Sequence, residues 1–227
     1  MKALLYKELK LAMHPICYVF IFAFPLMILI PSYPIAIGFL YVLTCYPILF
    51  LGANKGQQSN DLLYSTLLPV RKKDIVLARI FTVILIQATF ILLTTALFPI
   101  ALYIGKNVVV DEANQLNNMI PGLGHESYVL TLAIIIFGYA IADLIFFPIY
   151  YKNGKSIVMS TLFMIFGFIF YLGIFTIALP YIPGLEGMNH LHIGIQFGIL
   201  GVALILYAAL HIVVYRVSAK RLEQVDF

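Results

Sequence analysis

The sequence contains few charged residues, only two cysteines and no tryptophan. Charged side chains make up 11% of the 227 residues, whereas roughly 25% is usual for a soluble domain. Hydrophobic residues make up 63%, and the mean hydropathy is +1.01. Cys17 and Cys45 both lie in apolar runs, at different expected depths, so no disulfide framework is expected. This composition argues against a soluble globular protein and favours a membrane protein.

The sequence also lacks the common nucleotide-binding and hydrolytic motifs. It has no Gly-x-x-x-x-Gly-Lys-Ser/Thr loop, so we do not expect the chain to hold nucleotide phosphates itself. It has no His-Glu-x-x-His zinc motif and no Gly-x-Ser-x-Gly nucleophile turn. His125, His190 and His192 could collect a metal ion, but such loose spacing is more typical of ordinary interfacial histidines. We therefore expect no catalytic residue, metal or cofactor on this chain.

Six apolar runs approach the length of about 20 residues that a helix needs to cross a bilayer. They are 16–31, 35–52, 79–104, 127–151, 157–181 and 192–215. The first two are short and are joined by Pro31-Ser32-Tyr33-Pro34, so they form either a tight spanning hairpin or one that does not fully cross. The fold class that we expect is an all-α polytopic membrane protein, with six transmembrane helices in a single domain 1–227.

Lysine and arginine sort strongly between the two sides of such a bundle. If both ends are inside, 13 of the 14 basic residues fall on the inner side and only Lys106 falls outside. The outer loops instead carry Asp111, Glu112, Glu126 and Glu186. Because basic residues remain on the cytoplasmic side, both termini are expected to be cytoplasmic. The net charge of +4 is thus a signal of topology and not of nucleic-acid binding.

Residues 1–14 have the pattern of a basic amphipathic helix. Its apolar face consists of Leu5, Leu9, Ala12 and Met13. Lys7 and Lys10 lie opposite, so we expect a helix in the cytoplasmic interface with lysines at the lipid headgroups. His14-Pro15 would end it, because the residue before proline avoids helical geometry. The segment lacks a small-residue cleavage site and is not expected to be a signal peptide. The alternative is a frayed extension of the first span.

Asp143 is the one carboxylate inside a predicted span, and charges at that depth are expensive. It lies nine residues before Lys152, which is about 13 Å along a helix. That places it within reach of Arg79 or Arg216. Its role is open between a structural ion pair or hydrogen bond, a gating or substrate-path role, and proton coupling.

Five further polar side chains within the predicted spans are uncharged. Thr44, Gln87, Thr94, Thr95 and Gln196 are expected to form hydrogen bonds between helices. The segment from Gly194 to Gly198 is a small-xxx-small pattern that allows close approach of another helix, either within the chain or in a dimer.

The longest polar segment on the inner side is 53–78. Ser59 can cap a short helix that ends before Pro69, and Pro69 then suits the first turn of the helix entering the third span. The short helix would contain Asp61, Leu62, Leu63, Ser65, Thr66 and Leu67. It is either a docking helix for a cytosolic protein or a basic loop that binds anionic lipid.

The stretch Asp61 to Arg79 resembles the inner loop of bacterial ABC-2 type permeases. The match consists of Leu67, Leu68, Pro69, Arg71, Ile75, Val76 and Arg79. The interfacial N-terminal helix, six spans and inner termini also agree with that family over nearly the whole chain. In size the chain is similar to family members that export amphipathic peptides, such as the phenol-soluble modulin exporter permease.

The resemblance implies an ATP-driven exporter of the bacterial cytoplasmic membrane, built from two permease copies or two related permeases. A separate ATPase subunit would hold ATP and Mg and dock on a coupling helix within 53–78. The coupling residues would be Asp61, Leu62, Leu63, Leu67, Pro69 and Arg71. Residues 1–14 would form an elbow helix, with Leu5, Leu9, Lys7 and Lys10. The outer segment 181–192 is shorter than in many family members. The larger outer segment of this chain, 105–126, instead joins spans three and four, and 216–227 would be a cytoplasmic tail.

The expected cargo is amphipathic or hydrophobic because the spans are built mainly from apolar residues. Peptides such as cytolytic toxins are favoured, and drug or peptide-antibiotic efflux, including self-immunity, is the alternative. A stand-alone secondary transporter or channel is disfavoured by the single intramembrane carboxylate and the lack of an internal repeat. A membrane-anchored sensor is disfavoured by the lack of a substantial soluble domain.

Overall fold

The computed structural model describes residues 2–12, 15–30, 65, 69–107, 128–153, 157–174 and 193–224. Its elements are α1 (Lys2–Lys7), the π-helix η1 (Glu8–Ala12), α2 (Pro15–Leu26), the 3-10 helix η2 (Met27–Leu29), α5 (Lys72–Asn107), α7 (Tyr128–Asn153), α8 (Ile157–Gly173) and α9 (Ile193–Glu223). No strand occurs in these ranges, so the expected all-α class is confirmed for them.

Three helices are long and apolar enough to cross a membrane: Lys72–Ile104, Tyr128–Lys152 and Ile193–Glu223. A fourth span results if Leu4–Lys10 and Pro15–Leu29, which meet at a bend of 75°, are taken together. The apolar part of α8, Ile157–Tyr171, is shorter. The predicted second span 35–52 lies outside the described residues. Three to four spans are therefore supported, and six spans remain a prediction.

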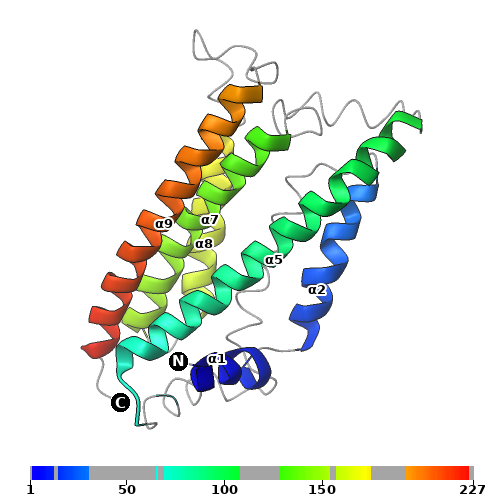
Figure 1. Ribbon diagram of the computed structural model, residues 1–227. Helices are drawn as coiled ribbons and strands as arrows, with labels where there is room; N and C mark the ends of the chain where they lie inside the picture. The colour runs from blue at the N-terminus through cyan, green and yellow to red at the C-terminus, as the bar shows by residue number, and fades with distance from the viewer. Residues whose placement is uncertain are drawn as a thin grey trace.

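The helices form a bundle in which α7 is central. α7 packs against α9 and α8, while α5 packs against α9 and α2. Figure 1 shows α5 crossing the bundle obliquely, from the lower end of α9 to the upper end of α2. In the most apolar stretch of α7, 72% of the residues are buried, whereas in that of α9 only 17% are buried. Since one end of the bundle carries α1, the start of α5 and the end of α9, several basic segments meet there (Figure 1).

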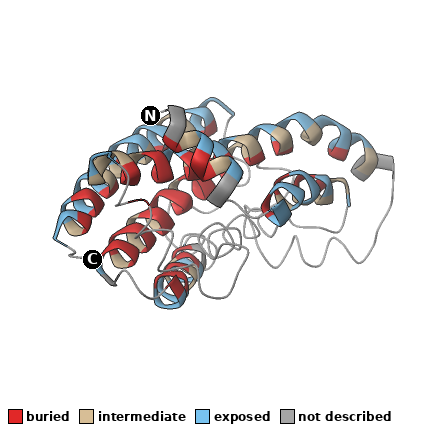
Figure 2. Cartoon of the chain, turned by 90° about the horizontal axis from the view of Figure 1, so that it is seen from below, coloured by how far each residue is buried: buried red, intermediate tan, exposed pale blue. Residues whose placement is uncertain are grey.

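The helices α5, α8 and α9 each have one buried face and one exposed face along their length. Seen from below, buried residues face the middle of the bundle and exposed residues face outward (Figure 2). The outward face of α9 is apolar, with Ile195, Val202 and Ile205 more than half exposed. In a bilayer such side chains contact lipid or another subunit, so their exposure carries no penalty.

Close contact between α7 and α8 depends on glycine. A Cβ atom at Gly138 would lie 2.6 Å from Cε2 of Phe168, and one at Gly167 would lie 2.3 Å from Cδ1 of Ile145. Phe168 is fully buried and stacks on Tyr139, so its ring has little room to move. By contrast, a Cβ atom at Gly198 on α9 meets nothing within 4 Å among the described residues. The expected close approach at Gly198 is therefore not made by these helices.

Replacing Gly138 with alanine should destabilise the bundle because the new methyl group overlaps the Phe168 and Tyr171 rings. We expect a loss of about 1–3 kcal/mol, as for overpacking in a filled core. The measurement is unfolding of the purified protein in increasing SDS, followed by circular dichroism. Gly198→Ala is the matched control and should be neutral or slightly stabilising; equal stability of the two variants would contradict the close α7–α8 contact.

Candidate functional site

The described helices contain two buried polar clusters. The first, the Glu8 cluster, consists of Lys7, Glu8, Ser65, Arg79 and Tyr150. The second, the Asp143 cluster, consists of Gln87, Asp143, Tyr207 and His211. Buried polar side chains need partners because desolvation is costly, so the position of each cluster specifies which helices meet.

At the centre of the Glu8 cluster is an ion pair between η1 and α5. Arg79 Nε donates to Glu8 Oε2 at 2.9 Å, and Arg79 Nη2 donates to Glu8 Oε1 at 3.2 Å. The two side chains are only 2% and 6% exposed. Two parallel charge-assisted bonds give both strength and a defined orientation. The pair therefore fixes η1 against the first turns of α5.

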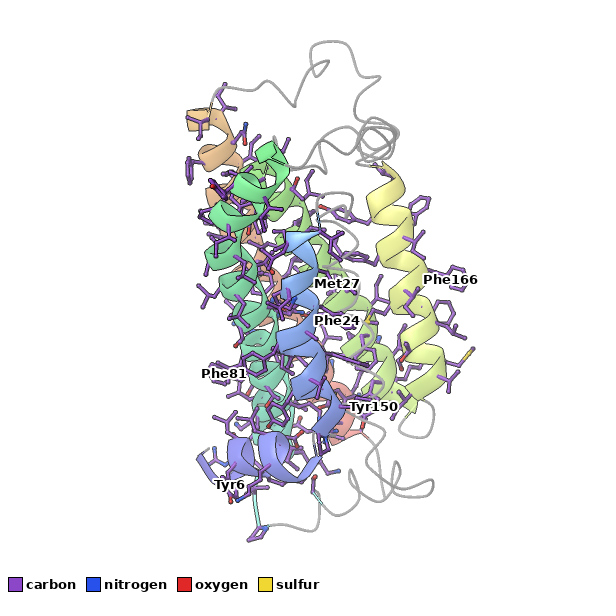
Figure 3. The ribbon with its side chains drawn as sticks, turned by 90° about the vertical axis from the view of Figure 1, so that its right-hand side faces the viewer. Tyr6, Phe24, Met27, Phe81, Tyr150 and Phe166 are labelled. Atoms are coloured by element: carbon purple, nitrogen blue, oxygen red, sulfur yellow. The ribbon has the colours of Figure 1, made fainter. Side chains whose placement is uncertain are left out.

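Further contacts extend this ion pair to α7 and to Ser65. Arg79 Nη1 donates to the hydroxyl of Tyr150 at 3.0 Å. Lys7 Nζ lies 3.4 Å from Glu8 Oε1 and donates to Ser65 Oγ. In Figure 3, Tyr150 lies toward the end of the bundle that α1 crosses. The cluster thus joins the N-terminal helices, Ser65 of the inner segment, α5 and α7.

The N-terminal helix differs from its predicted orientation. Lys10 is exposed, as expected, and its Nζ donates to the Tyr6 hydroxyl at 2.6 Å. Lys7, however, is only 9% exposed, and Leu5 and Leu9 are only half-buried. The expectation that Lys7 faces the headgroups is wrong, because its Nζ contacts Glu8 and Ser65 inside the bundle. Residues 8–12 adopt π geometry, a form that is frequent at functional sites.

Only part of the predicted coupling segment can be located. Asp61, Leu62, Leu63 and Leu67 lie outside the described residues. Pro69 and Arg71 are exposed, and the Arg71 carbonyl accepts from the Asp74 amide at 2.9 Å, so Arg71 directly precedes α5. The expectation that Pro69 opens this helix is wrong: the helix begins at Lys72. Of the residues expected in the coupling helix, Ser65 is described, and it is buried against Lys7.

The Asp143 cluster joins α5, α7 and α9. Asp143 is fully buried, and its Oδ2 lies 2.9 Å from Nε2 of His211. Gln87 Nε2 donates to the same oxygen at 3.1 Å. The hydroxyl of Tyr207 donates to Oε1 of Gln87. Gln87 of α5, Asp143 of α7 and two residues of α9 are thus connected by consecutive hydrogen bonds.

The predicted partners of Asp143 were wrong. Arg79 is engaged by Glu8 and Tyr150, and Arg216 is exposed. Gln87 lies two helical turns beyond Arg79 and is the α5 residue at the level of Asp143. The sequence reasoning also missed His211 and Glu8. Each carried a signal: His211 is an ionisable residue within the last apolar run, and Glu8 is the one acidic residue in the basic N-terminal segment.

The other polar side chains in the spans follow the expectation in part. Thr95 contacts the Tyr128 hydroxyl at 3.0 Å and so joins α5 to α7, whereas Thr94 donates to the Phe90 carbonyl of its own helix. Gln196 is buried on α9, and Thr44 lies outside the described residues. The described ranges contain no group of three potential metal ligands, and His125, His190 and His192 lie outside them.

Neutralising one member of the Glu8–Arg79 pair should leave a buried charge without its counterpart. We expect Glu8→Gln and Arg79→Gln each to cost about 3–5 kcal/mol of unfolding free energy. The double variant should cost clearly less than the sum, because both charges are then absent. SDS unfolding measures all four states of the cycle, with Arg71→Gln as the exposed control. Simple additivity would contradict a direct ion pair.

Comparison with known proteins places these features in a family. A sequence profile described as ABC-2 family transporter protein matches residues 3–221, which include both clusters. Searches of curated proteins and of solved structures gave no significant match. Permeases of this family normally work with an ATP-binding subunit. The chain belongs to the ABC-2 family of transporter proteins and is a multi-pass membrane permease of an ABC transporter.

Proposed function

We propose that this chain is the membrane-spanning subunit of an ATP-driven exporter in the bacterial cytoplasmic membrane. A separate ATPase subunit, which holds ATP and Mg, docks on the inner segment 53–78, and a second copy or a related permease completes the pathway. The observation that supports this most is the Glu8 cluster. Through Lys7 and Ser65, it connects the segment expected to bind the ATPase with the N-terminal helix and two spans.

The cluster suggests how movement of an ATPase reaches the helices. Ser65 lies between Leu63 and Leu67 of the proposed coupling helix, and the Lys7–Ser65 hydrogen bond connects that helix to η1. The bidentate Glu8–Arg79 pair then connects η1 to α5, and the Arg79–Tyr150 bond connects α5 to α7. A displacement of the coupling helix would therefore act on α5 and α7 together, near the ends at which they leave the membrane.

The proposed cargo is amphipathic or hydrophobic, with peptides such as cytolytic toxins favoured over drugs or peptide antibiotics. Phe163, Phe166 and Phe170 form an exposed stripe on α8 and are between 52% and 72% exposed. Phe166 points away from the neighbouring helices in Figure 3. Asp143 is fully buried and hydrogen-bonded, so it is not exposed on such a surface. An exposed apolar surface of this kind suits apolar or amphipathic cargo better than ions or sugars, if the second permease copy makes it part of the pathway. The peptide class is favoured because the chain is similar in size to the phenol-soluble modulin exporter permease.

A stand-alone secondary transporter is the second candidate function. The buried Asp143–His211 pair favours it, because intramembrane ionisable pairs are common in ion-coupled carriers. Family membership favours the ATP-driven function instead, since ABC-2 permeases normally work with an ATP-binding subunit. The docking experiment below distinguishes the two.

Docking should depend on the apolar face of the coupling helix. We expect Leu62→Glu combined with Leu63→Glu to reduce co-purification of the partner ATPase, which is to be sought in the adjacent reading frames, by about tenfold or more, as loss of an interface hot spot does. Leu116→Glu, in the outer loop 105–126, introduces the same charge on the opposite side and should leave the complex intact. A complex that survives both inner substitutions would contradict the docking assignment.

Cargo class can be tested on the reconstituted permease–ATPase complex. We expect amphipathic helical peptides to stimulate ATP hydrolysis several-fold, because binding of the transported cargo to the permease should be coupled to the activity of the ATPase docked on it. Scrambled peptides of the same composition that lack an amphipathic face are the matched control. Stimulation by hydrophobic drugs but not by amphipathic peptides would favour the efflux alternative.

A further inference from the structure

We propose that Asp143 and His211 bind one proton between them inside the membrane, and that this proton keeps α5, α7 and α9 joined. The proposal concerns a site on this chain alone. It therefore holds or fails independently of the ATPase partner and of the cargo.

The surroundings of the His211 ring determine where its hydrogen lies. His211 Nδ1 lies 2.8 Å from the backbone carbonyl oxygen of Tyr207. A carbonyl oxygen only accepts hydrogen bonds, so Nδ1 must carry a hydrogen. This fixes one tautomer of the neutral ring, in which Nε2 has a lone pair and no hydrogen.

The Nε2 lone pair of that tautomer would face the Asp143 carboxyl group. Nε2 lies 2.9 Å from Asp143 Oδ2, a distance typical of a hydrogen bond. If Asp143 is ionised, the bond requires a hydrogen on Nε2, and His211 is an imidazolium. If His211 is neutral, the bond requires a hydrogen on the carboxyl group. In both forms one proton lies in this contact and the pair has no net charge.

Removing the proton would change both the contact and the charge. The Nε2 lone pair would then face a carboxylate oxygen, and a net negative charge would remain on a pair that is buried in a spanning bundle. Both effects are unfavourable, because charge at membrane depth is expensive. The other neutral tautomer, with the hydrogen on Nε2, would offer a donor to Asp143 but would leave the Nδ1 lone pair facing the Tyr207 carbonyl oxygen.

The side chains that hydrogen-bond to this pair are neutral. Gln87 donates to Asp143 Oδ2, and Tyr207 donates to Gln87, so both are neutral partners on α5 and α9. Tyr139 is buried one turn before Asp143 on α7. The described parts of α2 and α8 carry no charged side chain. The charged residues of the other three helices lie toward their ends: Lys72, Lys73, Asp74, Arg79, Lys106, Lys152, Arg216, Lys220, Arg221 and Glu223.

The mechanical consequence follows from the position of the cluster between helices. α9 packs mainly against α7 and also against α5, while most residues of its apolar stretch remain exposed. The Asp143 cluster connects it to α7 directly and to α5 through Gln87. Loss of the proton should therefore weaken the attachment of α9 to α7 and, through Gln87, to α5.

The test uses the purified full-length chain in lipid nanodiscs. Infrared difference spectra against pH should show a single alkaline transition in which one carboxylic acid or one imidazolium signal is lost. Between about pH 6.5, where a free histidine releases its proton, and that transition, the unfolding equilibrium should shift toward the unfolded state by a factor of about ten for each pH unit, because the folded pair retains a proton that the unfolded chain has released. Above the transition this pH dependence should level off, because neither state then holds the proton.

Asp143→Asn supplies the decisive comparison. Its amide can donate to Nε2 permanently, and rotation of the Gln87 amide restores the remaining hydrogen bonds. This variant should fold and lose both the infrared transition and the pH dependence of unfolding. Glu223→Gln removes an exposed carboxylate near the end of α9 and should behave as wild type.

Two results would overturn the proposal. One is an unchanged alkaline transition in Asp143→Asn, which would assign the proton elsewhere. The other is the absence of any such transition in the wild type over the whole range in which the protein remains folded. The second measurement needs no substitution, so it decides the question even if the variant does not fold.

Discussion

The arrangement of this bundle depends on the cost of placing ionisable and polar groups in an apolar environment. Arg79, Glu8, Asp143 and His211 are all less than a tenth exposed. Each would be strongly unfavourable alone, so the helices that carry them must meet in the orientation that pairs them. Aliphatic contacts fill the remaining space, but lipid offers equivalent apolar contacts, and these do not select one partner helix over another.

The two clusters share the same pair of helices. α5 contributes Arg79 to one and Gln87 to the other, about 12 Å apart along the helix axis. α7 contributes Tyr150 and Asp143, about 10 Å apart. Because these spacings agree, α5 and α7 are joined at two levels, one connected to the N-terminal helix and the other to α9. This pair is the natural path between the inner segment and the middle of the bundle.

Predictions from the sequence succeeded where a local pattern carries the information. Apolar length gave the helices that became α5, α7 and α9, and the inner-segment residues indicated the ABC-2 family, which is confirmed over residues 3–221. Predictions failed where a partner had to be chosen. Lys7 was placed with the lipid headgroups, although Glu8 and Ser65 bury it, and Asp143 was assigned to arginines that are engaged by Glu8 or exposed.

The sequence by itself determined that this protein is helical, lies in a membrane and belongs to the ABC-2 family, because hydrophobic length and a short motif are properties of neighbouring residues. Only the tertiary structure decided that Glu8 pairs with Arg79 and Asp143 with His211. These partners are 71 and 68 residues apart, and nothing in the local sequence encodes which of several polar groups will reach the same depth. That choice is made when helices pack and each buried charge must find the partner that lowers its desolvation cost.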